Sequence, residues 1–160
     1  KAAKIKLKLN SITNYKIINK LYEASQAGVE VHMIVRGVCC LIPGIEGVSD
    51  NIEVISIIDK YLEHPRVYIF ENDGDPKMYI SSADLMTRNI ENRVEVACPI
   101  YDTDLQKLLL DTFMISWNDN VKARLLNGST QNEFKKSKGI PFRSQWEMHE
   151  YLKAQLENES

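Results

Sequence analysis

"KIKLKLNSITNYKIINKLYEASQAGVEVHMIV", residues 4–35, begins with six residues in which lysine alternates with an aliphatic side chain. This period of two predicts a strand with one buried face. Asn14 then suits the N-terminal cap of a helix, whose apolar residues recur at helical spacing until Gly28 ends it. The β-branched run 29–35 predicts a second strand. Because crossovers within one sheet are right-handed, this βαβ unit predicts two parallel, neighbouring strands.

The sequence after this unit predicts a mixed α/β domain. Residues 36–50 contain three glycines and a proline, and we expect a long loop at the end of the second strand, where open α/β sheets place their sites. A turn with the sequence NDGD is expected between two of the later strands. The expected elements are strands at 52–55, 67–70, 78–80 and 93–100, an amphipathic stretch at 57–62, and a helix from Asp102 or Thr103 to residue 118. The predicted fold class is therefore α/β, with a mixed sheet flanked by helices.

The last part of the chain loses this periodicity. Residues 127–143 are polar and basic, which predicts an exposed connector, followed by an amphipathic helix at 144–156. The basic cluster of the connector has few aromatic neighbours, so it is interpreted as a solvated loop rather than a nucleic-acid site; it contains Lys135, Lys136 and Lys138. The residues expected to dock the helix are Trp146, Tyr151 and Leu152. We therefore predict a domain at 1–126, with the connector and helix at 127–160 packed on it.

The composition is that of one globular domain. The chain of 160 residues has 44% hydrophobic and 26% charged residues and a net charge of −2, which disfavours a disordered, membrane-spanning or nucleic-acid-binding protein. Three cysteines without a disulfide or metal-binding spacing favour a reducing cytoplasm. Because the chain begins without Met and directly in a strand pattern, we interpret it as an excised part of a longer protein.

His64 and Arg36 are the first candidates for chemistry. His64 precedes Pro65, which pushes its backbone out of helical geometry and places the ring at a junction between elements. An imidazole there can act as a base, a nucleophile or a phosphate donor, and the alternative is a histidine that caps the end of a helix. Arg36 directly follows a buried strand, which is a costly place for a charge unless the guanidinium meets an anion or a carboxylate.

The polar run YISSADLMTRN, residues 79–89, is the second candidate. Ser81 and Ser82 follow a strand, and Asp84 is expected at the N-cap of a short helical turn whose free N–H groups bind an anion. Arg88 adds donors suited to a phosphate; the alternative is an ordinary capped helix with a solvated Arg88. Further along, Arg93 and Glu95 fit either surface partners or a buried pair, and their spacing favours the surface.

Three ordered blocks of the sequence carry a resemblance that is more specific than any short motif. They read LYEASQAGVEVHMIVRGVCCLIPG, SDNIEVISIIDKYLEHPRVYIFEN and YISSADLMTRNIENRVEVACPI. In this order they resemble the carboxyl-terminal domain of the bacterial polyphosphate kinases, and the resemblance runs from Ile5 to Trp117 and includes TQNEF beyond it. It implies a phospholipase D-like fold, in which two related α/β domains face each other across one site and each supplies a histidine.

The resemblance also implies roles for individual residues. His64 matches the second histidine of the site, which contacts the transferring phosphate or assists the leaving group, and Arg36 matches an arginine that contacts ATP phosphates. The run 79–89 matches a phosphate cradle in related hydrolases. The phosphate-binding residues implied there are Ser81, Arg88 and Asn89, and the supporting residues are Arg66, Asp84, Arg93 and Glu95.

The activity implied is that of an ATP:polyphosphate phosphotransferase, which moves the terminal phosphate of ATP reversibly to polyphosphate through a histidine of the preceding domain. ATP is expected with Mg²⁺, whose ligands the resemblance places on that preceding domain, so this chain is expected to hold no metal and to be inactive alone. The expected partners are ATP, ADP, polyphosphate and the preceding domains of the same chain. The resemblance is compatible with self-association. It also implies a cytoplasmic location, either free in the cytoplasm or peripheral at the inner membrane.

Two departures and two alternatives stand beside this resemblance. Ile42 and Asn92 occupy positions where many relatives carry arginine, so each removes a positive charge near the polyphosphate path. A phospholipase D-like phosphodiesterase or nuclease is disfavoured because Arg66 stands where the usual His-x-Lys motif has lysine. The other alternative is a non-catalytic docking domain that uses the helix at 102–118 as its interface.

Overall fold

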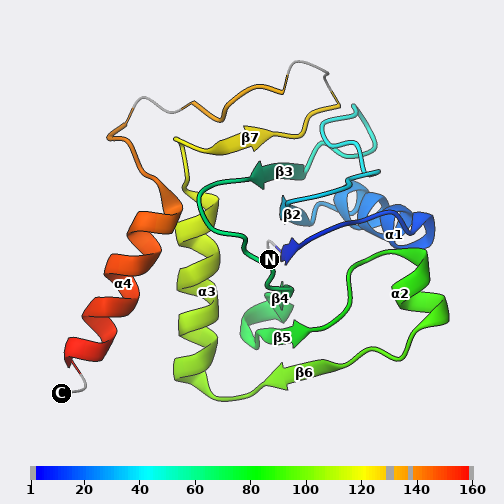
Figure 1. Ribbon diagram of the computed structural model, residues 1–160. Coiled ribbons are helices and arrows are strands. Elements are labelled where there is room, and N and C mark those ends of the chain that lie inside the picture. The colour runs from blue at the N-terminus through cyan, green and yellow to red at the C-terminus, as the bar shows by residue number, and fades with distance from the viewer. Residues whose placement is uncertain (1–2, 129–131, 137–138, 159–160) are drawn as a thin grey trace.

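The computed structural model describes residues 3–128, 132–136 and 139–158 (Figure 1). Its first elements are strand β1 (Lys4–Leu9), helix α1 (Tyr15–Gln26) and strand β2 (Glu30–Val35). The side-chain oxygen of Asn14 accepts hydrogen bonds from the backbone N–H groups of Lys16 and Ile17, which caps α1. β1 and β2 are parallel neighbours. The predicted βαβ unit is therefore confirmed.

The described strands form one mixed sheet with the order β6-β5-β4-β1-β2-β3-β7. β1, β2 and β3 are parallel, and every other pairing is antiparallel. The turn between β4 and β5 contains the 3₁₀ element η1 (Asn72–Gly74), at the NDGD sequence. The remaining strands are β3 (Ile52–Ile57), β4 (Val67–Phe70), β5 (Lys77–Ser81), β6 (Ala97–Ile100) and β7 (Ala123–Leu125).

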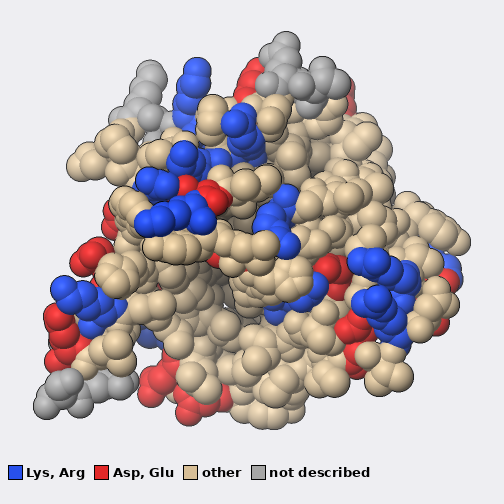
Figure 2. Space-filling view, viewed as in Figure 1, with Lys and Arg blue, Asp and Glu red and all other residues tan. Residues whose placement is uncertain are grey.

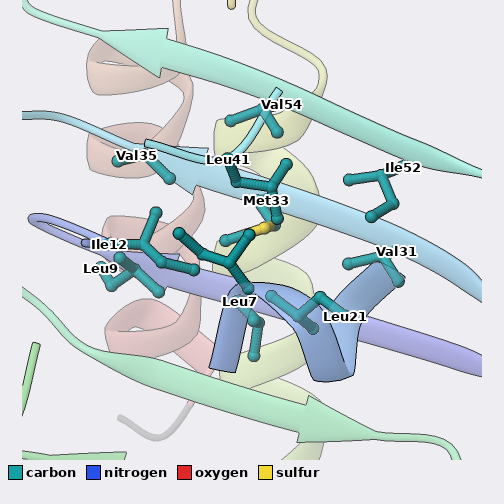
Figure 3. Packing of buried hydrophobic residues seen from close by; sticks show 11 residues of the cluster. Leu7, Leu9, Ile12, Leu21, Val31, Met33, Val35, Leu41, Ile52 and Val54 are labelled. Carbon is teal, nitrogen blue, oxygen red and sulfur yellow. The ribbon is translucent and has the colours of Figure 1, made fainter. Parts of the chain in front are cut away.

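Helices cover both faces of the sheet, so the protein has two cores. α1 lies on one side of the strands and α3 (Thr103–Trp117) on the other, with α4 (Ser144–Asn158) beside α3 (Figure 1). Side chains of β1, β2 and β3 point to the same side as Leu21 of α1 (Figure 3). Because side chains alternate along a strand, Met33 packs in this core whereas Ile34 packs on Phe113 and Trp117 in the other.

The lysine face of β1 is covered as well, and the prediction of a strand with a single buried face was wrong. Lys6 is 8% exposed, and its ammonium group lies 3.0 Å from a carboxylate oxygen of Glu71. Lys8 lies 2.6 Å from Glu63 and donates to Ser116 of α3 at 2.8 Å. Each buried ammonium has a partner, because an unpaired charge would be costly there.

Several other predicted elements differ from the structure. The amphipathic stretch expected at 57–62 forms no element of its own: Ile57 ends β3, and residues 58–66 form an irregular connector to β4. Strand β6 begins at Ala97 rather than at Arg93. The three-residue strand β7 was missed because it is too short to show periodicity. The helix predicted from Asp102 is confirmed, with Asp102 accepting from the N–H groups at the start of α3.

Of the three residues expected to dock the C-terminal helix, Tyr151 is partly buried, whereas Leu152 is 42% exposed. The Tyr151 hydroxyl donates to Asp111 of α3 at 2.8 Å, whereas Trp146 is 45% exposed and stacks under the cations of Lys60 and Arg143.

Lys135 is not a solvated loop residue, since it donates to the backbone oxygen of Trp117 and lies over that indole ring. Lys138 lies outside the described residues, and the predicted division between 126 and 127 stays a prediction. No helix among the described residues has the length and apolar character needed to span a bilayer.

Candidate functional site

The topology brings the predicted site residues to one edge of the sheet. β1 and β2 end there, and Asn10 and Arg36 are the residues that directly follow them. β4 is antiparallel to β1, so its start, with Arg66 just before it, lies at the same edge. β5 reverses direction again and ends there, ahead of Asp84. Residues distant in sequence therefore meet because of strand direction alone.

Arg36 and His64 are in direct contact at this edge. Two nitrogens of the Arg36 guanidinium donate to the side-chain oxygen of Asn10, at 2.9 and 2.7 Å. The same guanidinium lies 3.0 Å from Nδ1 of His64. Asn10 thus holds the guanidinium of Arg36 against the ring of His64, and the two residues that the sequence predicted to share a site lie side by side.

Arg66 approaches the other side of the His64 ring. Its guanidinium lies 2.8 Å from Nε2 of His64. A neutral imidazole has one nitrogen lone pair, and a guanidinium has only donors, so the ring can accept from one arginine at a time. The other arginine presents an N–H group that the ring does not satisfy. An anion such as a phosphate, which accepts from several donors, would fit this exposed group of side chains.

Asp84 anchors Arg66 and is not the helix cap that we predicted. Helix α2 (Thr87–Asn92) begins after Met86 and has no side-chain cap. The Asp84 carboxylate, 3% exposed, instead accepts from the backbone N–H groups of Asn10 and Ser11 and from the Arg66 guanidinium. Burial alone would raise the pKa of Asp84, but these hydrogen bonds outweigh it and hold the pKa below its usual value.

The remaining polar residues of the run 79–89 form a second cluster with internal hydrogen bonds. The Ser81 hydroxyl donates to the backbone oxygen of Val96 at 3.0 Å, and Ser82 donates to the carboxylate of Glu95. The amide of Asn89, which is 5% exposed, donates to the other oxygen of Glu95 at 2.6 Å. The bonds from Ser82 and Asn89 lower the pKa of Glu95. These donors stabilise the loop itself, and a phosphate would have to compete for them.

Arg88 and Arg93 are exposed at and just after helix α2. Basic side chains gather on the surface over this helix in Figure 2. Neither arginine forms a hydrogen bond with the group at His64 among the described residues. The structure therefore joins Arg36, His64, Arg66 and Asp84 into one group, and it leaves Arg88 and Arg93 as separate surface charges.

Asn10 and Ser11 were missed by the sequence reasoning. Both follow a strand directly, at the same edge as Arg36, and this position was the signal that could have found them. Their roles are to hold Arg36 and Asp84 through short contacts. Within the described ranges no three or more His, Cys, Asp or Glu side chains are grouped so as to hold a metal ion.

Comparison with known proteins identifies the family. The family model described as "Polyphosphate kinase C-terminal domain 2" matches residues 1–145. The chain belongs to the polyphosphate kinase family. It is 49% identical over 154 residues to a polyphosphate kinase from Vibrio parahaemolyticus, covering 96% of this chain and 22% of that protein. The chain thus spans about a fifth of the length of such curated relatives and corresponds to the C-terminal domain.

Solved structures support the same assignment. The polyphosphate kinase from Porphyromonas gingivalis superposes with a TM-score of 0.95 and 42% sequence identity, covering 99% of this chain and 24% of that one. A phospholipase D family member, Nuc from Salmonella typhimurium, superposes with a TM-score of 0.58 and 18% identity, covering 76% of this chain and 80% of that one. The second likeness concerns the fold alone and confirms the predicted phospholipase D-like class.

Proposed function

We propose that this chain forms one wall of the phosphoryl-transfer site of a polyphosphate kinase. The reaction is the reversible transfer of the terminal phosphate of ATP to polyphosphate, through a phosphohistidine on a preceding domain of the same protein. The observation that carries the proposal is the convergence of Arg36 and Arg66 on the two ring nitrogens of His64. Membership of the polyphosphate kinase family supplies the reaction class.

The proposed chemistry is positioning and charge neutralisation, because phosphoryl transfer leaves little covalent work to the protein. The N–H groups of Arg36 and Arg66 bind phosphoryl oxygens, and His64 donates to the transferring group or to the leaving oxygen. Asn10 and Asp84 hold the two guanidinium groups in place before substrate arrives. This preorganisation reduces the reorganisation that binding the phosphate requires.

The other arginines and the neutral donors act at the edges of this proposed site. Arg88 and Arg93, both exposed, bind phosphates further along the chain of ATP or polyphosphate. Ser81 and Asn89 serve as neutral donors once a phosphate replaces their contacts with Val96 and Glu95.

Mg²⁺ enters this proposal only as the companion of ATP. Two carboxylates lie beside this group of residues: Glu63 precedes His64 in the chain and is bound by Lys8, and Asp84 is bound by Arg66. The described residues hold no group of three or more His, Cys, Asp or Glu side chains placed to bind a metal ion, and our proposal keeps the ligands for Mg²⁺ on the preceding domain.

The test is phosphate transfer by the full-length kinase. A His64→Ala variant should lose incorporation of the labelled terminal phosphate of ATP into polyphosphate by about 10²- to 10⁴-fold, the usual contribution of a positioned acid–base group. His149→Ala is the matched control, because this exposed histidine lies on α4. Near-normal transfer by the His64 variant would refute the proposal, as would an equal loss in the control.

A further inference from the structure

The segment that carries His64 has no regular secondary structure of its own. Residues 58–66 connect β3 to β4 as an irregular stretch. The backbone hydrogen bonds of a helix or sheet therefore do not fix the position of the imidazole between Arg36 and Arg66. Contacts from other parts of the chain must fix it: Arg36 and Arg66 contact the ring itself, and residues at and just before the start of α4 bind the segment.

Gln145 binds the backbone of this segment as a strand would. Its side-chain oxygen accepts from the N–H group of Tyr61 at 3.0 Å, and its amide nitrogen donates to the backbone oxygen of Tyr61 at 2.8 Å. The same nitrogen lies 3.0 Å from the carboxylate of Glu63, the residue before His64. Gln145 is 7% exposed, so water competes little for these bonds. The amide side chain donates and accepts at the same time here, which a methionine side chain cannot do.

Two ion pairs hold the segment on either side of this contact. The second oxygen of Glu63 lies 2.6 Å from Lys8 of β1, whose ammonium group also donates to Ser116 of α3. Earlier in the segment, Arg143 forms a two-point contact with Asp59, at 2.7 and 2.5 Å, and the Asp59 side chain is 2% exposed. The segment is thus held at positions 59, 61 and 63, immediately before the histidine.

We propose that Gln145 is a positioning residue for His64 in phosphoryl transfer, and this inference rests on the proposed function. Gln145 lies 81 residues from His64 in the chain and acts on it through Tyr61 and Glu63, not through the substrate. Loss of its amide frees the segment, and the imidazole then spends less time in line with Arg36 and Arg66. Misplacement of a reacting group by about 1 Å can cost on the order of 10²-fold in rate.

The experiment measures steady-state transfer by the full-length kinase with Gln145→Met, which keeps the length of the side chain and removes the amide. We expect kcat to fall by about 10- to 100-fold, with the KM for ATP changed far less. Gln155→Ala, an exposed glutamine on the same helix, is the control and should leave both constants unchanged. A normal kcat for Gln145→Met would overturn the inference even if His64→Ala is inactive.

The same substitution in a His64→Ala background separates positioning from general damage. If Gln145 acts through His64, Gln145→Met should not lower the residual rate of the His64→Ala enzyme further. A loss by the same factor in both backgrounds would mean a merely structural role. Normal transfer by His64→Ala alone would instead refute the proposed function, whatever Gln145 does.

A second variant decides the matter if Gln145→Met fails to fold. Glu63→Ala removes the carboxylate that accepts from the amide of Gln145 and pairs with Lys8, and it leaves Gln145 and its bonds to Tyr61 in place. We expect it to lower kcat in the His64 enzyme and to have no further effect in the His64→Ala enzyme. An unchanged kcat would contradict the inference.

Discussion

At the scale of single residues, the site is built from side chains that bind one another before any substrate is present. Asn10 and Asp84 contact Arg36 and Arg66, and Gln145 contacts the segment that carries His64; we propose that these contacts position the groups that act in phosphoryl transfer. Charged groups in this arrangement need partners in the resting protein, because burial without a partner would cost several kcal/mol. In the proposed function, the same partners orient the arginines for a phosphate.

The first residue-scale prediction concerns Asp84. Replacing it with alanine should destabilise the chain by about 3–5 kcal/mol, because Arg66 and two backbone N–H groups lose a buried acceptor. Urea unfolding at neutral pH measures this loss. The control is Asp104→Ala, an exposed aspartate in the first turn of α3, whose effect should stay within about 1 kcal/mol.

The pH dependence of a second variant, Asp84→Asn, follows from the lowered pKa of Asp84. A depressed pKa gives stability that is complete above the unfolded value of about 3.9 and is lost as pH falls through the folded value. The gap in unfolding free energy between the parent chain and Asp84→Asn should therefore be constant near neutral pH and shrink below about pH 4. A gap that widens as the pH falls would contradict the assignment of this carboxylate.

At the scale of elements, local signals predicted the βαβ unit and helix α3 because caps and periodicity there agree with packing. Asn14 and Asp102 cap their helices as expected.

Asn14 offers a clear test, because its side chain accepts from two N–H groups at the start of α1. Asn14→Ala should cost about 1 kcal/mol of unfolding free energy. Asn19→Ala, exposed on the same helix, should cost little, and equal losses would argue against capping.

The elements that the sequence did not predict are those fixed by tertiary contacts. The connector 58–66 shows an amphipathic pattern but no helix, because Gln145 and Arg143 bind its backbone and side chains from 80 or more positions away. Likewise, Asp84 has the residue type of a cap and sits close to a helix, but two N–H groups and an arginine bind it more completely. Where such long-range hydrogen bonds form, they determine the local structure in place of helix propensity.

For the candidate site, the sequence predicted that Arg36 and His64 belong together, and strand direction explains why they do. The sequence did not reveal Asn10 or Gln145, because neither residue type signals a site without its partner. The catalytic, phosphate-binding and supporting roles stay predictions for all the site residues: Arg36, His64, Arg66, Ser81, Asp84, Arg88, Asn89, Arg93 and Glu95.

At the scale of the whole molecule, the chain spans 22% of the relative from Vibrio parahaemolyticus, and the proposed site is open on the side of His64. We therefore expect the chain alone to bind polyphosphate without transferring phosphate. Isothermal titration should show binding at low salt that weakens as salt rises, since the contacts are ionic. Measurable kinase activity of the chain alone would contradict this division of the site.

Ile42 allows the charge of this surface to be tested. It is 47% exposed in the loop that follows Arg36. Ile42→Arg should tighten polyphosphate binding at low salt, and the gain should fall as salt screens it. Ile140→Arg adds the same charge at a residue that is 88% exposed in the C-terminal connector. Equal gains in the two variants would mean that only net charge matters.

The central claim is that Arg36 and His64 act on the same phosphoryl group, and a double-mutant cycle in the full-length kinase tests it most directly. The quantity measured is kcat/KM for ATP with Arg36→Ala, with His64→Ala and with both. We predict that kcat/KM of the double variant falls about as far as that of the more damaged single variant. The two side chains are in contact and act as one unit, so a second substitution removes little that the first has not already removed. A double variant that loses the product of the two single effects, as independent sites do, would contradict the account.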